Sequence, residues 1–235
     1  MKYTVILLGK KTVAKNTVAF EFERPKDFTF CAGQYATFKL IDPVFTDEKG
    51  PMRAMSFASP PSADTLLIAM RMSDSAFKKS ICELSCGDVV ELEGPFGKLV
   101  LDKDDTLPIV CIAGGIGITP FMSMISDEQE KGFPREITLL YSNCNPEEAT
   151  FFDELNAIIH KNLTVVSTMT DIEKNTDWRG ECKKIDQDII ERYVSNDSRS
   201  LFYLCGSTGM VVAMKTILES MGVPKDHIKM ELFGV

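Results

Sequence analysis

A glycine-rich turn between an apolar run and a helical pattern most constrains how this chain folds. Residues 109–113 are apolar, the run breaks into Gly114, Gly115 and Gly117, and a helical pattern resumes at Pro120. This order predicts a buried strand, a tight turn and a helix start. Glycines let the backbone approach a ligand closely, and the free amides of a helix start favour an anion such as a pyrophosphate. Taken alone, the segment also fits an ordinary strand-to-helix turn.

The second half of the chain alternates between predicted strands and helices. We expect strands at residues 109–113, 137–141, 163–169, 201–205 and 228–232, and helices at residues 120–131, 147–161, 185–194 and 208–221. This alternation predicts an α/β doubly wound parallel-sheet (Rossmann-like) domain, which binds ligands outside the carboxyl ends of its strands. Residues 114–117, 142–145 and 206–209 fall at those ends.

The first hundred residues have a different pattern, of short and partly alternating strands. We expect strands at residues 3–9, 17–23, 34–41, 65–72 and 88–93, with one helix at residues 75–84. Many short strands separated by turn residues predict an all-β barrel domain. The polar stretch at residues 101–106 is interpreted as a linker. The predicted domains are therefore 1–101 and 107–235.

Composition and charge narrow the class of partner. The chain has a net charge of −8, which argues against nucleic acid as the main partner. Arg71, Lys78 and Lys79 could still form a local basic patch. No apolar run reaches the length of a membrane span. Residues 1–10 lack the features of a signal peptide, so we expect them to form a first strand and the protein to be cytoplasmic.

The cysteines and histidines do not form a metal-binding pattern. Seven cysteines at irregular spacing are typical of reduced thiols. Cys82 and Cys86 lie four residues apart, but no second pair or nearby histidine completes a zinc or iron–sulfur set. His160 and His227 are the only histidines. We therefore expect no metal site.

Five further short motifs occur along the chain, and their order is part of the pattern. They are the segments 33–35, 53–56, 94–97, 205–206 and 231–234. Together with the glycine-rich turn, this ordered set resembles the ferredoxin–NADP reductase superfamily over nearly the whole chain. The resemblance implies a single reductase module with an FAD-binding barrel followed by an NAD(P)-binding domain. In such a module the flavin carries the redox chemistry.

The resemblance implies a flavin site on the barrel. Arg53 would hold the pyrophosphate, for which its bidentate geometry is suited; Met55 would cover one face of the flavin, and Ser56 would touch the ring edge. The family usually has Tyr where Met55 stands, but a thioether can also lie on an aromatic ring. The complete set of predicted flavin contacts is Arg53, Ala54, Met55, Ser56, Ala69, Met70, Arg71, Ala76, Phe77 and Lys78.

Alternative interpretations of the flavin-site residues remain. The amides of Ala76, Phe77 and Lys78 would face a phosphate from a helix start that Ser73, Asp74 or Ser75 caps. The same segment fits an ordinary capped helix with solvated lysines, without the glycine that the family often has here. Arg53 also fits a surface arginine beside a buried strand.

The resemblance places the nicotinamide coenzyme on the second domain. Its predicted contacts are Gly114, Gly115, Gly117, Thr119, Ser142, Asn143, Cys205, Gly206 and Met210. Cys205 would position the nicotinamide ring, and Phe233 would cover the second flavin face, where nicotinamide must arrive. Cys205, Ser56 and Phe233 are therefore the predicted catalytic residues. A buried strand-end cysteine and a core phenylalanine are the alternatives.

Coenzyme choice depends on the segment after the strand at 137–141. A 2′-phosphate calls for Arg or Lys, whereas a free ribose favours a carboxylate. Cys144 stands where similar family members often carry Arg, and Glu147 and Glu148 follow. NADH is therefore favoured over NADPH, with Arg179 as the remaining candidate for a phosphate contact.

Three functions are compatible with these residues. The leading hypothesis is an FAD-containing NAD(P)H oxidoreductase that passes electrons through flavin to a separate electron-acceptor protein, of ferredoxin, flavodoxin or other redox type, or to a small molecule. A second is an electron-transfer subunit of a larger redox complex, although family members of that kind carry a cysteine cluster near the C-terminus that this sequence lacks. A third is a flavin redox sensor without turnover; the intact glycine-rich turn and Cys205-Gly206 argue against it.

Overall fold

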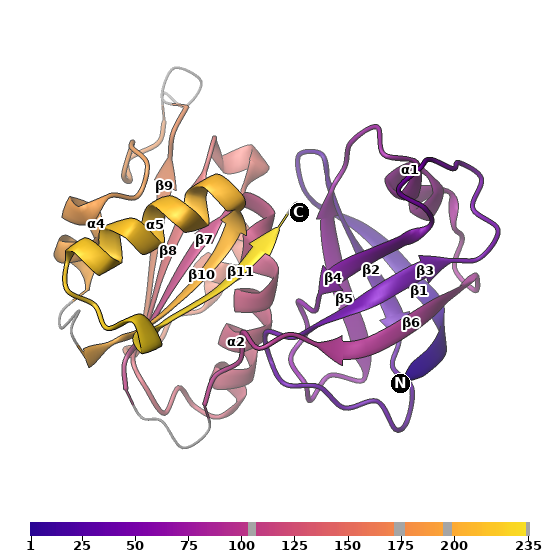
Figure 1. Cartoon of the computed structure of the whole chain (residues 1–235), viewed down its shortest axis with the longest axis horizontal. Coiled ribbons are helices and arrows are strands. Elements are labelled where there is room, and N and C mark those ends of the chain that lie inside the picture. Colours follow the sequence, from indigo (N-terminus) through magenta and orange to yellow (C-terminus); the bar gives the residue numbers. More distant parts are fainter. Residues whose placement is uncertain (103–106, 172–176, 195–198, 234–235) are drawn as a thin grey trace.

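The computed structural model describes residues 1–102, 107–171, 177–194 and 199–233, and it contains two sheets side by side (Figure 1). The first sheet is antiparallel, with the strand order β4-β3-β6-β1-β2-β5. Its elements are β1 (Lys2–Ala14), β2 (Thr17–Glu23), β3 (Tyr35–Leu40), β4 (Met52–Ser56), β5 (Thr65–Arg71), the helix α1 (Ala76–Glu83) and β6 (Val89–Phe96). This arrangement confirms the predicted barrel-like domain.

The second sheet is parallel, with the strand order β11-β10-β7-β8-β9. Its strands are β7 (Ile109–Gly114), β8 (Ile137–Asn143), β9 (Leu163–Met169), β10 (Leu201–Ser207) and β11 (Ile228–Phe233). Its helices are α2 (Thr119–Glu130), α3 (Phe152–Ala157), α4 (Gln187–Tyr193) and α5 (Thr208–Ser220), with 3-10 turns η1 (Gly115–Ile118), η2 (Pro146–Glu148) and η5 (Lys225–His227). The predicted α/β doubly wound sheet is therefore confirmed.

Strand alternation divides the core of the second half into two layers. Ile109, Cys111 and Ala113 of β7 pack in the same cluster as residues of α2. Val110 and Ile112 pack on the opposite face, in the cluster that contains residues of α4 and α5. Successive side chains of a strand point to opposite faces, so a strand that is apolar throughout requires helices on both sides.

Helix α2 also packs against the barrel, and this contact joins the two halves. The Ser123 hydroxyl donates a buried hydrogen bond of 2.6 Å to the Ser59 carbonyl. Gly33 has a φ of 95°, and a Cβ there would lie 2.1 Å from the Leu99 carbonyl oxygen and 2.3 Å from the Met124 methyl group. Any other residue at position 33 would clash with the Leu99 backbone and displace the end of the Met124 side chain.

One predicted helix differs from the structure, and one strand of the structure was not predicted. The helix expected at 147–161 is replaced by the short η2 and by α3, because Phe151 adopts a left-handed φ of 58° between them. The Asn145 side chain caps η2 by accepting a hydrogen bond from the Glu148 amide at 3.1 Å. Strand β4 was not among the strands expected, and residues 103–106 of the expected linker lie outside the described residues.

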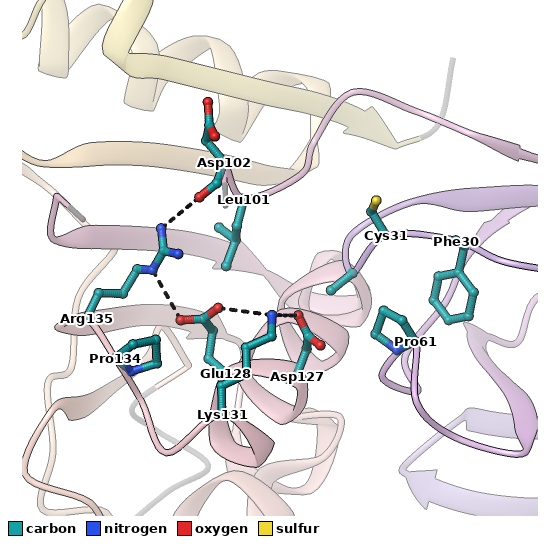
Figure 2. A pocket seen from close by; sticks show the side chains of 11 residues that line it. Phe30, Cys31, Pro61, Leu101, Asp102, Asp127, Glu128, Lys131, Pro134 and Arg135 are labelled. Carbon is teal, nitrogen blue, oxygen red and sulfur yellow. Dashed lines mark hydrogen bonds and ion pairs between the residues drawn. The ribbon is translucent and has the colours of Figure 1, made fainter. Parts of the chain in front are cut away.

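A cavity of about 440 Å³ lies between the barrel and the end of α2 (Figure 2). Its charged side chains pair with one another: Glu128 and Arg135, both buried, form an ion pair at 3.2 Å, and Lys131 pairs with Asp127 and Glu128. The Arg135 guanidinium also donates to the Asp102 carbonyl at 3.1 Å. None of the lining residues belongs to the predicted cofactor sites, and the paired charges attach α2 to the segment that leaves the barrel.

Candidate active site

Three cations from different elements gather at one side of the barrel. They are Arg53 on β4, Arg71 at the end of β5 and Lys78 on α1. The Lys78 ammonium donates to the Arg71 carbonyl at 2.6 Å, and burial together with the charges of Arg53 and Arg71 lowers the Lys78 pKa. Lys79, which the sequence grouped with them, instead pairs with Asp74 at 3.2 Å. Cations placed so close together call for an anion.

A carboxylate already lies between Arg53 and the start of α1. The Ala76 amide donates to Asp47 Oδ2 at 3.2 Å, and Arg53 Nη2 lies 3.8 Å from Asp47 Oδ1. Ser75, the N-cap residue, makes no side-chain capping bond. We call the space between the Arg53 guanidinium and the Ala76 amide the anion slot. Its donors fit a phosphate group, since a helix start and an arginine both favour one.

The remaining predicted flavin contacts surround this slot. Phe77 is buried beneath the Arg53 guanidinium, which lies 5.3 Å from its ring centroid. Ser56 is buried at the end of β4, and its hydroxyl has no hydrogen-bond partner within the described part of the chain. Such an orphan hydroxyl calls for a ligand contact. Met55 is half-buried beside the barrel core, and Ala54 is exposed.

Strand β5 contributes chiefly its backbone and Arg71. The side chains of Ala69 and Met70 are buried in the hydrophobic clusters. The barrel closes where Phe57, just after β4, bridges to Ile68 of β5. The two cations Arg53 and Arg71 therefore stand on the strands that meet at this closure.

The glycine-rich turn packs directly on the end of strand β10. A Cβ on Gly117 would lie 2.5 Å from the Cys205 carbonyl oxygen and 2.7 Å from the Gly206 amide nitrogen. A Cβ on Gly114 would lie 2.1 Å from the sulfur of Met210. The structure thus brings together these five predicted residues at the carboxyl edge of the sheet, where doubly wound folds bind ligands.

Two other predicted residues of this turn have different surroundings. Gly115 has a φ of 53° and open space where a Cβ would be, which leaves its backbone accessible. The buried Thr119 hydroxyl donates to the Ile116 carbonyl at 3.1 Å and fixes the entry into α2. Thr119 therefore shapes the turn, whereas Gly115 presents it to solvent.

The segment after β8 is attached to the barrel by ion pairs. Ser142 is paired in the sheet with Gly114, and Asn143 is buried next to it. Arg71 Nη1 lies 2.8 Å from Glu148 Oε2, and its Nη2 donates to the Glu148 carbonyl at 2.9 Å. Lys15 pairs with Glu147 at 3.1 Å. The nearest barrel cations are thereby matched by carboxylates of this segment.

Glu231 is a further candidate site residue, which the motifs alone do not reveal. It is paired with Cys205 across β10 and β11, and its Oε1 lies 3.6 Å from where a Cβ of the barrel residue Gly97 would be. Burial raises the Glu231 pKa to about 7. Burial and the Glu231 charge raise the pKa of the Cys205 thiol, which keeps that thiol protonated. The missed signal was strand alternation, which places residues 231 and 233 on one face.

The roles of Phe233 and Arg179 stay predictions. The backbone of Phe233 ends β11 opposite Ser207, and its side chain lies outside the described residues, so its role stays a prediction. Arg179 is exposed beside Trp178, which covers Gly180. Among the residues described, we find no group of three His, Cys, Asp or Glu side chains that could hold a metal.

The chain is similar in sequence to known oxidoreductases. The model of the oxidoreductase NAD-binding domain matches residues 111–216. Flavohemoprotein A of Dictyostelium discoideum is 30% identical over 94% of this chain and 57% of its own length. The terephthalate 1,2-dioxygenase reductase component 1 of a Comamonas species is 28% identical over 87% of this chain and 60% of its own length.

The fold is shared with a reductase of similar size. The structure of a ferredoxin NADP+ reductase from Neisseria gonorrhoeae, with bound FAD and NADP, superposes with a TM-score of 0.84 at 23% identity and covers 98% of both chains. In its fold and in its matched NAD-binding domain, the chain is similar to members of the ferredoxin–NADP reductase superfamily, as the ordered motifs predicted. It spans only 57% and 60% of the two curated relatives described above.

Proposed function

We propose that this protein is an FAD-containing NAD(P)H oxidoreductase, which passes electrons from a nicotinamide coenzyme through flavin to a separate acceptor. In this proposal residues 1–101 form the FAD-binding domain and residues 107–235 the NAD(P)-binding domain. Flavin bound here would supply the redox chemistry, since it accepts two electrons as hydride and releases them singly or in pairs.

The observation that carries the proposal is the meeting of the two halves at Glu231. Cys205 and Glu231 stand at the carboxyl edge of the parallel sheet, and Glu231 reaches the barrel at Gly97. Coenzyme bound at that edge and flavin bound on the barrel would therefore have adjacent rings. Hydride transfer needs this proximity, with reacting atoms roughly 3–3.5 Å apart.

The anion slot supports FAD over FMN. Arg53 and the Ala76 amide are two donors on different elements, and the positive charge of Lys78 is close enough to Arg53 for the two to interact. A pyrophosphate can use several such donors, whereas one terminal phosphate carries less charge to satisfy them. Ser56 would hold the ring edge through its unpartnered hydroxyl, and Met55 would lie on the ring face.

The coenzyme side is assigned to the residues that pack at the ends of β7 and β10. The backbone of Gly114, Gly115 and Gly117 would approach the coenzyme closely, and Cys205 would fix the nicotinamide ring through its uncharged thiol. Phe233 would cover the flavin until the coenzyme arrives. Burial keeps a proton on the Glu231 carboxyl up to a pH of about 7, so this group can hold a proton beside the reacting rings.

NADH is the proposed coenzyme. The segment 142–148 contains no Arg or Lys, and the barrel cations that reach it, Lys15 and Arg71, are paired with Glu147 and Glu148. A 2′-phosphate placed there would meet carboxylates, whereas a free ribose can donate hydrogen bonds to them.

For the electron acceptor we propose only a chemical class. The Comamonas relative is the reductase component of a dioxygenase, and the Neisseria structure is a single-module ferredoxin NADP+ reductase. By analogy we propose a separate redox protein or a small molecule. No helix of the described chain is both long and apolar enough to span a membrane. The seven free cysteines support a reducing compartment such as the cytoplasm.

The identity of the flavin tests the proposal. We expect the purified protein to be yellow and to release FAD on acid denaturation, at about one equivalent per chain, as chromatography would show. Recovery of FMN alone would contradict the assignment of Arg53 and α1 to a pyrophosphate. A protein that takes up no flavin when incubated with FAD would contradict the proposed function itself.

A further inference from the structure

Asp47 occupies the anion slot that FAD would need. Its carboxylate accepts hydrogen bonds from the amides of Ala76 at 3.2 Å and Lys49 at 3.0 Å, and it pairs with Arg53 at 3.8 Å. Ala76 and Arg53 are the two donors that the proposed function assigns to the pyrophosphate. One negative group therefore already stands where another would have to bind.

The segment that carries Asp47 is attached at both ends, so its position is well defined. Ser80 Oγ of α1 accepts from the Phe45 amide at 2.8 Å and donates to the Phe45 carbonyl at 3.0 Å. On the other side, Arg53 Nη1 donates to the Gly50 carbonyl at 2.9 Å. The loop between β3 and β4 is thus fastened to α1 and β4, with Asp47 between the two attachments.

The contact between Asp47 and Arg53 is weaker than the one a phosphate could make. Arg53 Nη2 is buried without a hydrogen-bond partner in the described structure, and the 3.8 Å to Asp47 is longer than the roughly 2.7–2.9 Å of a charge-assisted hydrogen bond. A phosphate oxygen in the slot could satisfy this nitrogen. Both anions cannot stay, because like charges in a half-buried site repel strongly.

We propose that Asp47 is an internal competitor for the pyrophosphate of FAD. Its carboxylate closes the anion slot of the flavin-free protein and leaves the slot when FAD binds, with movement of residues 46–50. The inference rests on the proposed function. Because only the open fraction of the protein can bind, the measured FAD affinity is lower than the site itself would give.

Titration of the flavin-free protein with FAD and with riboflavin tests this inference, with quenching of flavin fluorescence as the readout. Asp47→Asn removes the charge and keeps the shape, so it should bind FAD about tenfold more tightly than the wild type. Riboflavin has no phosphate, and its affinity should be the same in both proteins. Asp47→Ala also removes any contact that the asparagine amide of the first variant could make in the slot. It should show the same gain in FAD affinity.

The control variant is Glu48→Gln, which removes an equal charge from the neighbouring exposed position. It should leave both affinities unchanged. The inference is overturned if Asp47→Asn and Asp47→Ala bind FAD no more tightly than the wild type, or if Glu48→Gln gives the same gain. A wild-type protein that binds neither flavin would overturn the proposed function, whereas FAD binding that ignores Asp47 overturns only this inference.

Discussion

At the scale of the residue, Arg53 gives the flavin assignment its sharpest test. Replacement by alanine removes charge-assisted hydrogen bonds worth roughly 1.5–3 kcal/mol. FAD affinity should therefore fall by about tenfold to more than a hundredfold, and the folded variant should purify largely colourless. Lys79→Ala is the matched control, because Lys79 is a nearby cation that pairs with Asp74 outside the slot. Full FAD occupancy in Arg53→Ala would mean that Arg53 is a surface residue that does not bind FAD.

Because Glu231 is shielded from water, it should make the free energy of unfolding depend on pH. Burial raises its pKa from 4.5 to about 7 in the folded protein, so between these pH values the folded state keeps a proton that the unfolded state loses. The free energy of unfolding therefore decreases as pH rises through this window. Glu231→Gln cannot ionise and should lose this contribution.

Thermal melts of both proteins at pH 5 and pH 8 measure the effect. The melting temperature of Glu231→Gln should fall less between the two pH values than that of the wild type, and other titrating groups cancel in the comparison. Equal falls in the two proteins would mean that Glu231 is not buried as the structure has it.

Replacement of Phe233 distinguishes two possible roles of its ring: covering the flavin, or packing in the hydrophobic core. If its ring covers the flavin, the coenzyme must displace it, and only the open fraction of the protein binds. Phe233→Ser should then bind both coenzymes more tightly and discriminate less between them. If the ring belongs to a core instead, its loss should cost about 3–5 kcal/mol of stability. A large drop in melting temperature with unaltered coenzyme affinity would exclude the shielding role.

At the scale of the element, the turn between β7 and α2 depends on one close backbone contact. Gly117→Ala would place a Cβ 2.5 Å from the Cys205 carbonyl oxygen, and backbone atoms have no side-chain freedom with which to yield. The variant should lose about 1–3 kcal/mol of stability and most of its coenzyme affinity. Gly209→Ala, where a Cβ meets no atom within 4 Å, should leave both near wild-type values. Denaturant unfolding and NADH titration check both variants.

Elements were predicted best where the pattern is local. The sequence correctly predicts β7, β10 and the glycine-rich turn, because apolar runs and glycine placement are patterns of only a few residues. The helix expected at 147–161 failed for the opposite reason: the left-handed Phe151 interrupts an otherwise helical composition. Strand β4 is not predicted because its pattern is short and has the charged Arg53 at its second position.

At the scale of the whole molecule, the sequence could predict which motifs gather at the carboxyl edge of the parallel sheet, but not which side chains meet between distant segments. Cys205 and the glycines were found from their motifs. The contact of Glu231 with the barrel and the place of Asp47 between Arg53 and Ala76 depend on packing between distant segments. No spacing rule encodes such contacts.

Anaerobic stopped-flow mixing of the FAD-loaded protein with NADH and, separately, with NADPH tests the central claim most directly. We expect NADH to bleach the flavin absorbance band in a single phase, with an amplitude that corresponds to all of the bound FAD. NADPH should do so about tenfold more slowly, since Lys15 and Arg71, the cations that contact this segment among the described residues, are already paired with Glu147 and Glu148. Faster bleaching by NADPH would contradict the coenzyme assignment. An unbleached band with both coenzymes, in protein shown to hold FAD, would contradict the proposed function.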